Sequence, residues 1–239
     1  MFFVVIFTAT IVKAQSGYNY TEWGWGVEGG NTLGYTNVQR QYEHGFIALD
    51  AVYNYGPYLP IVAELQIGQL SGGGTTANLD PFGRQYSNNY KALVFYADVH
   101  LGAAIDYQGS WVLGVLKNFY VGTGFGLIYN DTKVQRTNTI AANGPLTYVF
   151  PGKNSSVDPL IPMRVGYEFK IFDDYNEPSM AIDIGYAQNF AFGEGLDGYN
   201  DPQSKFKNNA SDQYRQILIG FKYFFGNVVS YNKLIRDPR

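Results

Sequence analysis

The segment Gln216–Phe225 reads Gln-Ile-Leu-Ile-Gly-Phe-Lys-Tyr-Phe-Phe. Successive side chains of a β-strand point to opposite faces of its sheet. One face of this segment carries Ile217, Ile219, Phe221, Tyr223 and Phe225, and the other carries Gln216, Gly220 and Lys222. The segment is therefore predicted to be a strand with one apolar and one polar face.

The same alternation recurs about eight times along the chain. The predicted strands are Trp23–Gly30, Gly45–Tyr55, Ile61–Leu70, Tyr90–Leu101, Phe119–Tyr129, Leu160–Phe172, Met180–Phe190 and Tyr214–Phe225. The composition favours strands, since 21 Tyr, 17 Phe and 28 Gly stand against 3 Met. We predict an all-β fold, an eight-stranded antiparallel transmembrane β-barrel with long extracellular loops and short periplasmic turns.

The N-terminal residues have the features of an export signal. Residues 1–12 are almost wholly apolar, and Val12-Lys13-Ala14 precedes Gln15, which predicts a signal peptide over residues 1–14. The apolar run is shorter than the roughly 20 residues that a spanning helix needs. The barrel is expected over residues 15–226, and residues 227–239 are expected to form a short periplasmic tail.

Several classes of function are disfavoured by composition and motif context. The chain has no Cys and two His, which leaves no Cys/His zinc cluster, and its net charge of −3 offers no footprint for nucleic acid. Gly122-Thr-Gly124-Phe-Gly126 lies within a strand and lacks the helix of a phosphate loop. Asp197–Asp201 lacks the spacing and terminal Glu of a calcium loop and is interpreted as a turn. We expect neither a cofactor nor a metal.

The connections predict which end of the barrel faces outward. Asn31–His44, Ser71–Asn89, Asn130–Pro159 and Ala191–Gln213 are long and polar, whereas residues 56–60 and 173–178 are tight turns. The connection Ala103–Asn118 breaks this rule, and Ser110 could cap a short helix within it. That segment is either a helix at the periplasmic membrane interface or a loop packed under the barrel floor.

Periodicity alone leaves a soluble lipocalin-like barrel as an alternative. Aromatic residues near the strand ends favour the membrane, because such girdles lie at membrane interfaces. The predicted girdle is Trp23, Trp25, Tyr53, Tyr55, Phe119, Tyr129, Phe169, Phe190, Tyr223 and Phe225. Inward-facing glycines at Gly122, Gly124 and Gly126 would let a narrow barrel curve.

The polar face predicts a charged lumen. Its residues are Glu28, Asp50, Glu64, Asp98, His100, Arg164, Glu168, Lys170, Asp183 and Lys222. Eight strands enclose a space that side chains just fill, so we expect a closed, hydrogen-bonded interior. A narrow proton or ion path through Asp98, His100 and Lys222 is the alternative.

The sequence gives little support for catalysis. His100 shares a face with Asp98 and is expected to point inward, away from acyl chains. His44 is expected to be a solvated loop residue near the outer rim, with no partner Ser at a defined spacing. We predict no enzyme activity.

The signal ending at Ala14-Gln15, the eight alternating strands and the final Gly220-x-x-Tyr223-x-Phe225 resemble the small bacterial outer-membrane barrels. The chain resembles the porin-family barrels of Bacteroidetes, which are similar in architecture to the OmpA barrel and OmpX. The resemblance implies location in the bacterial outer membrane, contact with its lipid, and recognition of Gly220, Tyr223 and Phe225 by the barrel-assembly machinery.

The expected role lies in the surface loops, because a rigid barrel wall holds them in place. We predict a non-enzymatic monomer that serves envelope structure or surface interaction, with Tyr148, Phe150 and Pro151 as apolar contact points and a surface or periplasmic protein as partner. A component of a PorT-like secretion or transport assembly, or a narrow pore, is the alternative. A lipid-modifying enzyme is the third hypothesis.

Overall fold

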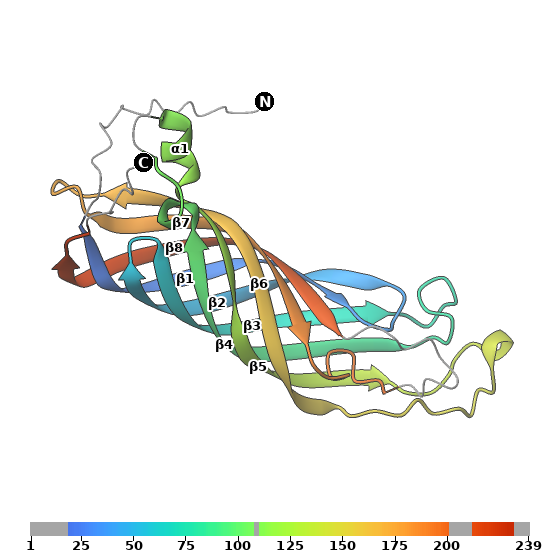
Figure 1. Cartoon of the computed structure of the whole chain (residues 1–239). Coiled ribbons are helices and arrows are strands. Elements are labelled where there is room, and N and C mark those ends of the chain that lie inside the picture. Colours follow the sequence, from blue (N-terminus) through green and yellow to red (C-terminus); the bar gives the residue numbers. More distant parts are fainter. Residues whose placement is uncertain (1–18, 108–109, 201–211, 232–239) are drawn as a thin grey trace, which may run out of the picture.

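The computed structural model describes residues 19–107, 110–200 and 212–231, so the predicted signal peptide over residues 1–14 and residues 232–239 of the predicted tail lie outside the described residues. Its eight strands form one closed antiparallel barrel in which each strand pairs with its neighbours in sequence (Figure 1). The strands are β1 (Tyr20–Tyr35), β2 (Gln41–Gly56), β3 (Leu59–Gly73), β4 (Gln85–His100), β5 (Phe119–Gln135), β6 (Ser155–Phe172), β7 (Pro178–Ala191) and β8 (Gln213–Val229). Pairing of β8 with β1, from Tyr20 opposite Val229 to Tyr35 opposite Gln213, closes the wall. The predicted fold class is confirmed.

The strands are longer than the sequence pattern predicts, chiefly toward the extracellular end. β1 continues to Tyr35 and β2 begins at Gln41, so the expected long loop Asn31–His44 is wrong and only residues 36–40 connect these strands. The reason is that outward positions become polar there, as at Asn31 and Glu43, and the apolar alternation no longer marks the strand. The connections 74–84, 136–154 and 192–212 are long, and 57–58 and 173–177 are tight turns.

The register gives the barrel a stagger of ten residues. Following paired inward residues once around the wall from Ala191 on β7 leads to Ala181 on the same strand. The residues on this path are Ala191, Leu160, Gly126, Val94, Glu64, Asp50, Gly26, Lys222 and Ala181. Such a stagger requires the strands to tilt, and it brings side chains from distant parts of the chain to one level of the lumen.

The connection between β4 and β5 contains helix α1 (Trp111–Leu116), as Ser110 predicts. The backbone N–H of Leu113 donates to the Ser110 hydroxyl at 3.5 Å, which caps the first turn. Among the residues that the structure describes, no helix has the length and apolar character needed to cross a membrane.

Candidate functional site

The ten polar residues predicted to face the lumen, nine that carry a charge and His100, lie inside the barrel. Nine of them are at most 5 % exposed, and the side chain of Lys170 is 7 % exposed. The strands hold them there because each occupies an inward position of the alternating pattern. They form one network, which we call the lumen charge cluster.

Arg164 on β6 lies at the centre of the lumen charge cluster. Its Nη1 is 3.3 Å from Glu64 Oε2, its Nη2 is 3.4 Å from Glu28 Oε1 and its Nε is 3.6 Å from Asp98 Oδ1. The guanidinium also stacks 4.0 Å from the centre of the Tyr96 ring. A planar cation with five N–H donors suits this position, because several carboxylates can share its charge.

Lys222 on β8 makes a second set of ion pairs, closer to the periplasmic end. Its Nζ is 3.0 Å from Asp183 Oδ2 and 3.1 Å from Glu168 Oε2. Glu168 also meets Lys170 Nζ at 3.5 Å and His100 Nε2 at 3.8 Å. Asp98, His100 and Lys222 are therefore held within ion-paired surroundings, which does not favour the alternative of an open ion path.

Three inward glycines make room for these charges. In the strand register, each lies between two charged residues on its neighbouring strands. The pairs are Asp50 and Lys222 beside Gly26, Asp98 and Arg164 beside Gly122, and Glu28 and Asp183 beside Gly220. A Cβ at Gly122 would lie 1.9 Å from Asp98 Oδ1. Absence of a side chain at these positions is therefore what lets the charged groups converge.

Three carboxylates of the cluster could be considered as metal ligands. Glu28, Asp50 and Glu64 each place one oxygen within 4.8 Å of the others. Within the described part of the chain, neither carboxylate oxygen of Asp50 has a hydrogen-bond partner. However, Arg164 already contacts Glu28 and Glu64, and its positive charge disfavours a second cation at this place.

A neutral polar layer lies between the charge cluster and the extracellular mouth. The Tyr214 hydroxyl and Gln216 Nε2 both donate to Gln66 Oε1, at 3.1 and 3.2 Å. Gln216 Nε2 also donates to the Tyr90 hydroxyl at 3.3 Å, and Asn189 Nδ2 donates to Gln216 Oε1 at 2.9 Å. These side chains fill the barrel at this level and pair with one another.

The extracellular mouth is closed by residues 195–199, which we call the cap segment. Leu196, Asp197 and Tyr199 are fully buried. The Tyr199 hydroxyl donates to the Gln135 carbonyl at 2.6 Å and accepts from the Gln85 N–H at 3.0 Å, so it joins the ends of β4 and β5. This contact set was not predicted from the sequence, because residues of an irregular loop carry no periodic signal.

Asp197 is the charged residue of the cap segment. Its carboxylate accepts from the backbone N–H groups of Tyr199 at 2.9 Å and Asn37 at 3.3 Å. Burial raises the pKa of Asp197 to about 7, against the lowering effect of these hydrogen bonds and of Arg84. Burial likewise raises the pKa of Asp212, whose Oδ2 accepts from Leu196 N at 3.0 Å.

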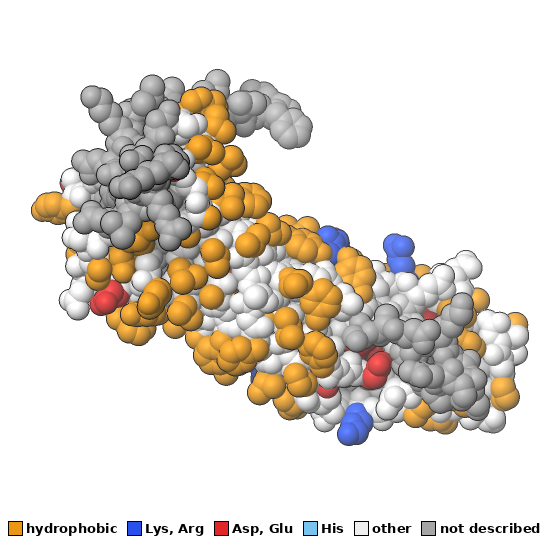
Figure 2. All heavy atoms as spheres, in the orientation of Figure 1, with side chains coloured by type: hydrophobic (Ala, Val, Ile, Leu, Met, Phe, Trp, Pro, Cys, Tyr) orange, Lys and Arg blue, Asp and Glu red, His pale blue; other side chains and the backbone are white. Residues whose placement is uncertain are grey.

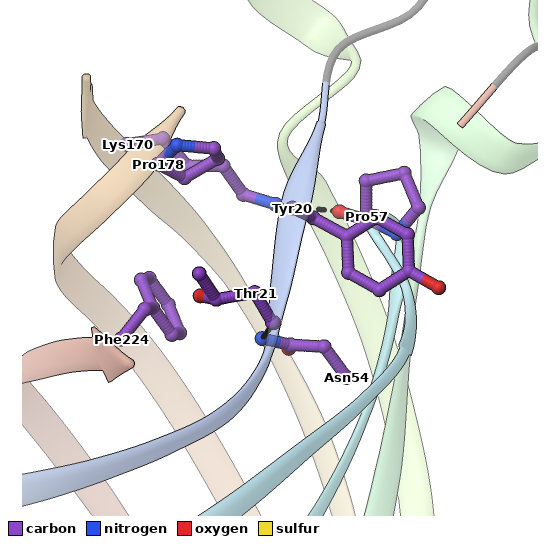
Figure 3. A pocket seen from close by; sticks show the side chains of 7 residues that line it. All are labelled: Tyr20, Thr21, Asn54, Pro57, Lys170, Pro178 and Phe224. Carbon is purple, nitrogen blue, oxygen red and sulfur yellow. Dashed lines mark hydrogen bonds between the residues drawn. The ribbon is translucent and has the colours of Figure 1, made fainter. Parts of the chain in front are cut away.

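The opposite end of the lumen has a shallow pocket, shown in Figure 3. Its lining residues are Tyr20, Thr21, Asn54, Pro57, Lys170, Pro178 and Phe224. Lys170 Nζ donates to the Pro57 carbonyl at 2.5 Å, and Asn54 Nδ2 donates to the Thr21 carbonyl at 2.8 Å (Figure 3). These polar groups are paired with the barrel's own backbone, so the pocket offers little for binding a ligand.

His44 lies in β2 and not in a loop, which corrects the expectation from sequence. Its Nε2 is 2.7 Å from Ser71 Oγ on β3, so it has a serine partner that sequence spacing did not reveal. A catalytic histidine of this kind also needs a group that orients its other ring nitrogen. In the described residues no hydrogen bond to that nitrogen is present, and the pair lacks the third member of a hydrolytic triad.

The outer wall of the barrel carries a broad apolar band (Figure 2). Its centre consists of outward aliphatic residues such as Leu49, Leu65, Leu93 and Ile219, all of them exposed. Burying such a band in hydrocarbon is favourable, whereas leaving it in water is not. The band therefore faces lipid, and the soluble-barrel alternative does not fit it.

The predicted girdle residues lie mostly at the periplasmic edge of this band. Eight of them are exposed, namely Trp23, Trp25, Tyr55, Phe119, Tyr129, Phe169, Tyr223 and Phe225. Tyr53 is partly buried against Trp23, with ring centres 4.9 Å apart. Phe190 lies beyond Gln188, between Gln213 on β8 and the exposed Ile161 on β6, at the extracellular end of β7.

A closed eight-stranded barrel with a lipid-facing band, short turns at one end and longer loops at the other defines a class, the small bacterial outer-membrane β-barrels. No protein-family model matches the chain, and no curated protein matches it. Recognition of Gly220, Tyr223 and Phe225 by the assembly machinery stays a prediction.

Solved structures of this class resemble the chain. Neisserial surface protein A is 10 % identical, with 85 % of this chain and 97 % of that chain covered and a TM-score of 0.43. The attachment invasion locus protein Ail of Yersinia pestis is 11 % identical, with 85 % and 99 % covered and a TM-score of 0.40. OprG of Pseudomonas aeruginosa is 12 % identical, with 86 % and 98 % covered and a TM-score of 0.36. The likeness goes no further than the barrel architecture, and the resemblance to Bacteroidetes barrels stays a prediction.

Proposed function

We propose that the protein is a non-enzymatic outer-membrane barrel that makes surface contacts through its extracellular loops. The observation that carries this proposal is the combination of a filled lumen with a firmly held extracellular hairpin over residues 136–154. Arg164 and Lys222 are surrounded by carboxylates, and Tyr199 seals the mouth, so the interior formed by the described residues offers no route for a solute. The extracellular loops are then the part of the protein that can contact other molecules at the cell surface.

The hairpin 136–154 projects beyond the barrel wall at the extracellular end (Figure 1). Its base is held by an isolated bridge between Thr137 and Val149 and by Arg136 Nη1, which donates to the Gly198 carbonyl at 3.1 Å. A hairpin held in this way loses little conformational entropy when it binds a partner.

The apolar contact points differ from those expected from sequence. Phe150 is buried, and Tyr148 packs edge-on against it with ring centres 5.1 Å apart, so these two rings anchor the hairpin from within. Leu146 and Val149 are the exposed large apolar side chains of the hairpin, and Pro151 is also exposed. We propose Leu146 and Val149 as the contact residues.

The test compares cells that display the wild-type barrel with cells that display Leu146→Ser/Val149→Ser. Attachment to other cells and to immobilised protein and polysaccharide surfaces would be measured, with equal surface levels checked by heat-dependent gel mobility. The matched control is Lys153→Ser, an exposed substitution in the same hairpin. We expect attachment to fall several-fold in the double variant alone. Wild-type cells that attach no better than cells lacking the barrel would overturn the proposal.

The alternative of a narrow pore predicts conductance. Purified barrel in a planar bilayer is expected to conduct no ions, since the cap segment and the lumen charge cluster fill its length. Discrete conductance steps that disappear when Lys222 is replaced would favour the pore over the surface role.

A further inference from the structure

Helix α1 presents two different faces. Leu113 points inward and packs against the pair of buried rings Tyr58 and Tyr107, whose centres are 5.9 Å apart. Trp111, Val112, Val115 and Leu116 are exposed, and Trp111 is 82 % exposed. At about 100° per residue these four fall within an arc of roughly 140°, and Leu113 lies outside it. The apolar arc of the helix therefore faces away from the protein, whereas the apolar face of a surface helix usually packs against the core.

The apolar arc of α1 (Trp111, Val112, Val115 and Leu116) lies beside the aromatic girdle at the periplasmic edge of the barrel's apolar band. The Tyr167 hydroxyl, on the outer face of β6, donates to the Val115 carbonyl at 2.8 Å. The Tyr167 ring packs on Phe169, with centres 4.5 Å apart, and Phe169 is an exposed girdle residue. The helix is thus fixed to the outside of the wall at the level where the lipid-facing band ends.

The arrangement in space agrees with these contacts. In Figure 1 the helix stands to the side of the barrel at the end where β1 begins and β8 ends, away from the lumen axis. In Figure 2 its hydrophobic side chains continue into the hydrophobic band on the wall. Phe119, the first residue of β5 after the helix, is exposed and pairs with Tyr167, which joins the two surfaces.

We propose that α1 is an interfacial anchor, with its apolar arc buried in the periplasmic leaflet of the outer membrane next to the barrel wall. The occupant of this surface is phospholipid, because the arc is continuous with a surface that already faces lipid. A tryptophan with three aliphatic neighbours is the composition that partitions to the headgroup boundary. Lys117, at the end of the helix, has its Nζ 4.8 Å from the centre of the Tyr107 ring and so lies on the protein side.

The test uses Trp111 as its own probe. The chain has three Trp, so Trp23→Phe/Trp25→Phe leaves Trp111 as the single tryptophan. The folded variant would be placed in phosphatidylcholine vesicles that carry bromine near the headgroup end or near the methyl end of the acyl chains. We expect blue-shifted emission, stronger quenching by the shallow bromines than by the deep ones, and several-fold protection from acrylamide in water.

Two controls make the result decisive. Trp23→Phe/Trp111→Phe leaves Trp25, which reports the girdle depth directly. Adding Val112→Ser/Val115→Ser to the Trp111 probe is expected to raise acrylamide quenching several-fold, whereas adding Gly114→Ser, outside the arc, is not. Emission typical of water with quenching by acrylamide alone, in a variant whose heat-dependent gel mobility shows it folded, would overturn the anchor and leave a periplasmic protein as the partner of this face.

Discussion

Two buried polar clusters in this barrel are built on opposite principles. In the lumen charge cluster, side chains from the strands pair with one another, as Arg164 does with Glu28 and Glu64. In the cap segment, side chains of a loop pair with backbone groups, as Tyr199 does with Gln85 and Gln135. The comparison indicates that the first cluster contributes to the stability of the whole barrel, whereas the second controls the local stability of its mouth.

The largest expected effect is that of Arg164→Met. Removing the guanidinium leaves several carboxylates buried without their shared cation, which should cost about 3–5 kcal/mol of the free energy of unfolding. Urea unfolding in lipid vesicles would measure it. The control is Arg215→Met, which removes an ion pair with the exposed Glu43 and should cost about 1 kcal/mol or less. Equal losses from the two variants would contradict a central role for the lumen charge cluster.

A smaller effect is expected from Gly122→Ala, which adds one methyl group to the same cluster. The new Cβ would meet Asp98 Oδ1, and moving that carboxylate disturbs its approach to Arg164. The cost should be about 1–3 kcal/mol, typical of overpacking in a tight interior. Gly114→Ala, where a Cβ meets nothing within 4 Å, should instead stabilise helix α1 by about 0.5–1 kcal/mol. If urea unfolding shows both variants unchanged, the interior is looser than described.

At the mouth, Tyr199→Phe should loosen the cap segment without unfolding the barrel. The Gln85 N–H and the Gln135 carbonyl would lose their buried partner, at a local cost of about 1–3 kcal/mol. Hydrogen exchange at the Gln85 amide should accelerate, while urea unfolding of the barrel changes little. Tyr186→Phe, which removes an exposed hydrogen bond to Gln188, is the control and should leave that amide protected.

The stability of the cap segment is also expected to depend on pH. Because the pKa of Asp197 is raised to about 7 in the folded state, that state binds the proton more tightly than an open loop does. The stability of the cap should be highest below about pH 4, the ordinary value for Asp, and should fall as pH rises toward 7. Hydrogen exchange of residues 195–199 at pH 5 and pH 8 would measure this change.

Asp197→Asn/Asp212→Asn should remove most of this pH dependence, because burial raises the pKa of both carboxyl groups. The barrel's own unfolding serves as the internal reference at each pH. The exchange rates of the wild type and the double variant would be corrected for the intrinsic rate and compared. An equal increase from pH 5 to pH 8 in both would show that Asp197 and Asp212 do not govern the pH dependence of the cap segment.

The contrast between the clusters also explains how far sequence reasoning could go. Alternation places Arg164 and Glu168 on one face of a strand, and the same pattern predicts the fold and the inward direction of each charge. It does not predict which charges meet, since Arg164 and Glu28 are brought together by the stagger of the closed wall. Nor does it predict that Phe150 turns inward or that His44 meets Ser71, because tertiary contacts between loops and irregular strand ends have no period.

Closure of the wall has a consequence for biogenesis. Glu28 is on β1 and Arg164 is on β6, so in an open sheet five strand positions separate them, and their ion pair exists only after β8 has paired with β1. Lys222, by contrast, can reach Asp183 on β7 and Glu168 on β6 as soon as β8 joins β7, which is already paired with β6. The pairing of β8 with β1 therefore also completes the neutralisation of the interior. A barrel in which these two strands have not paired would retain Glu28 without its guanidinium partner.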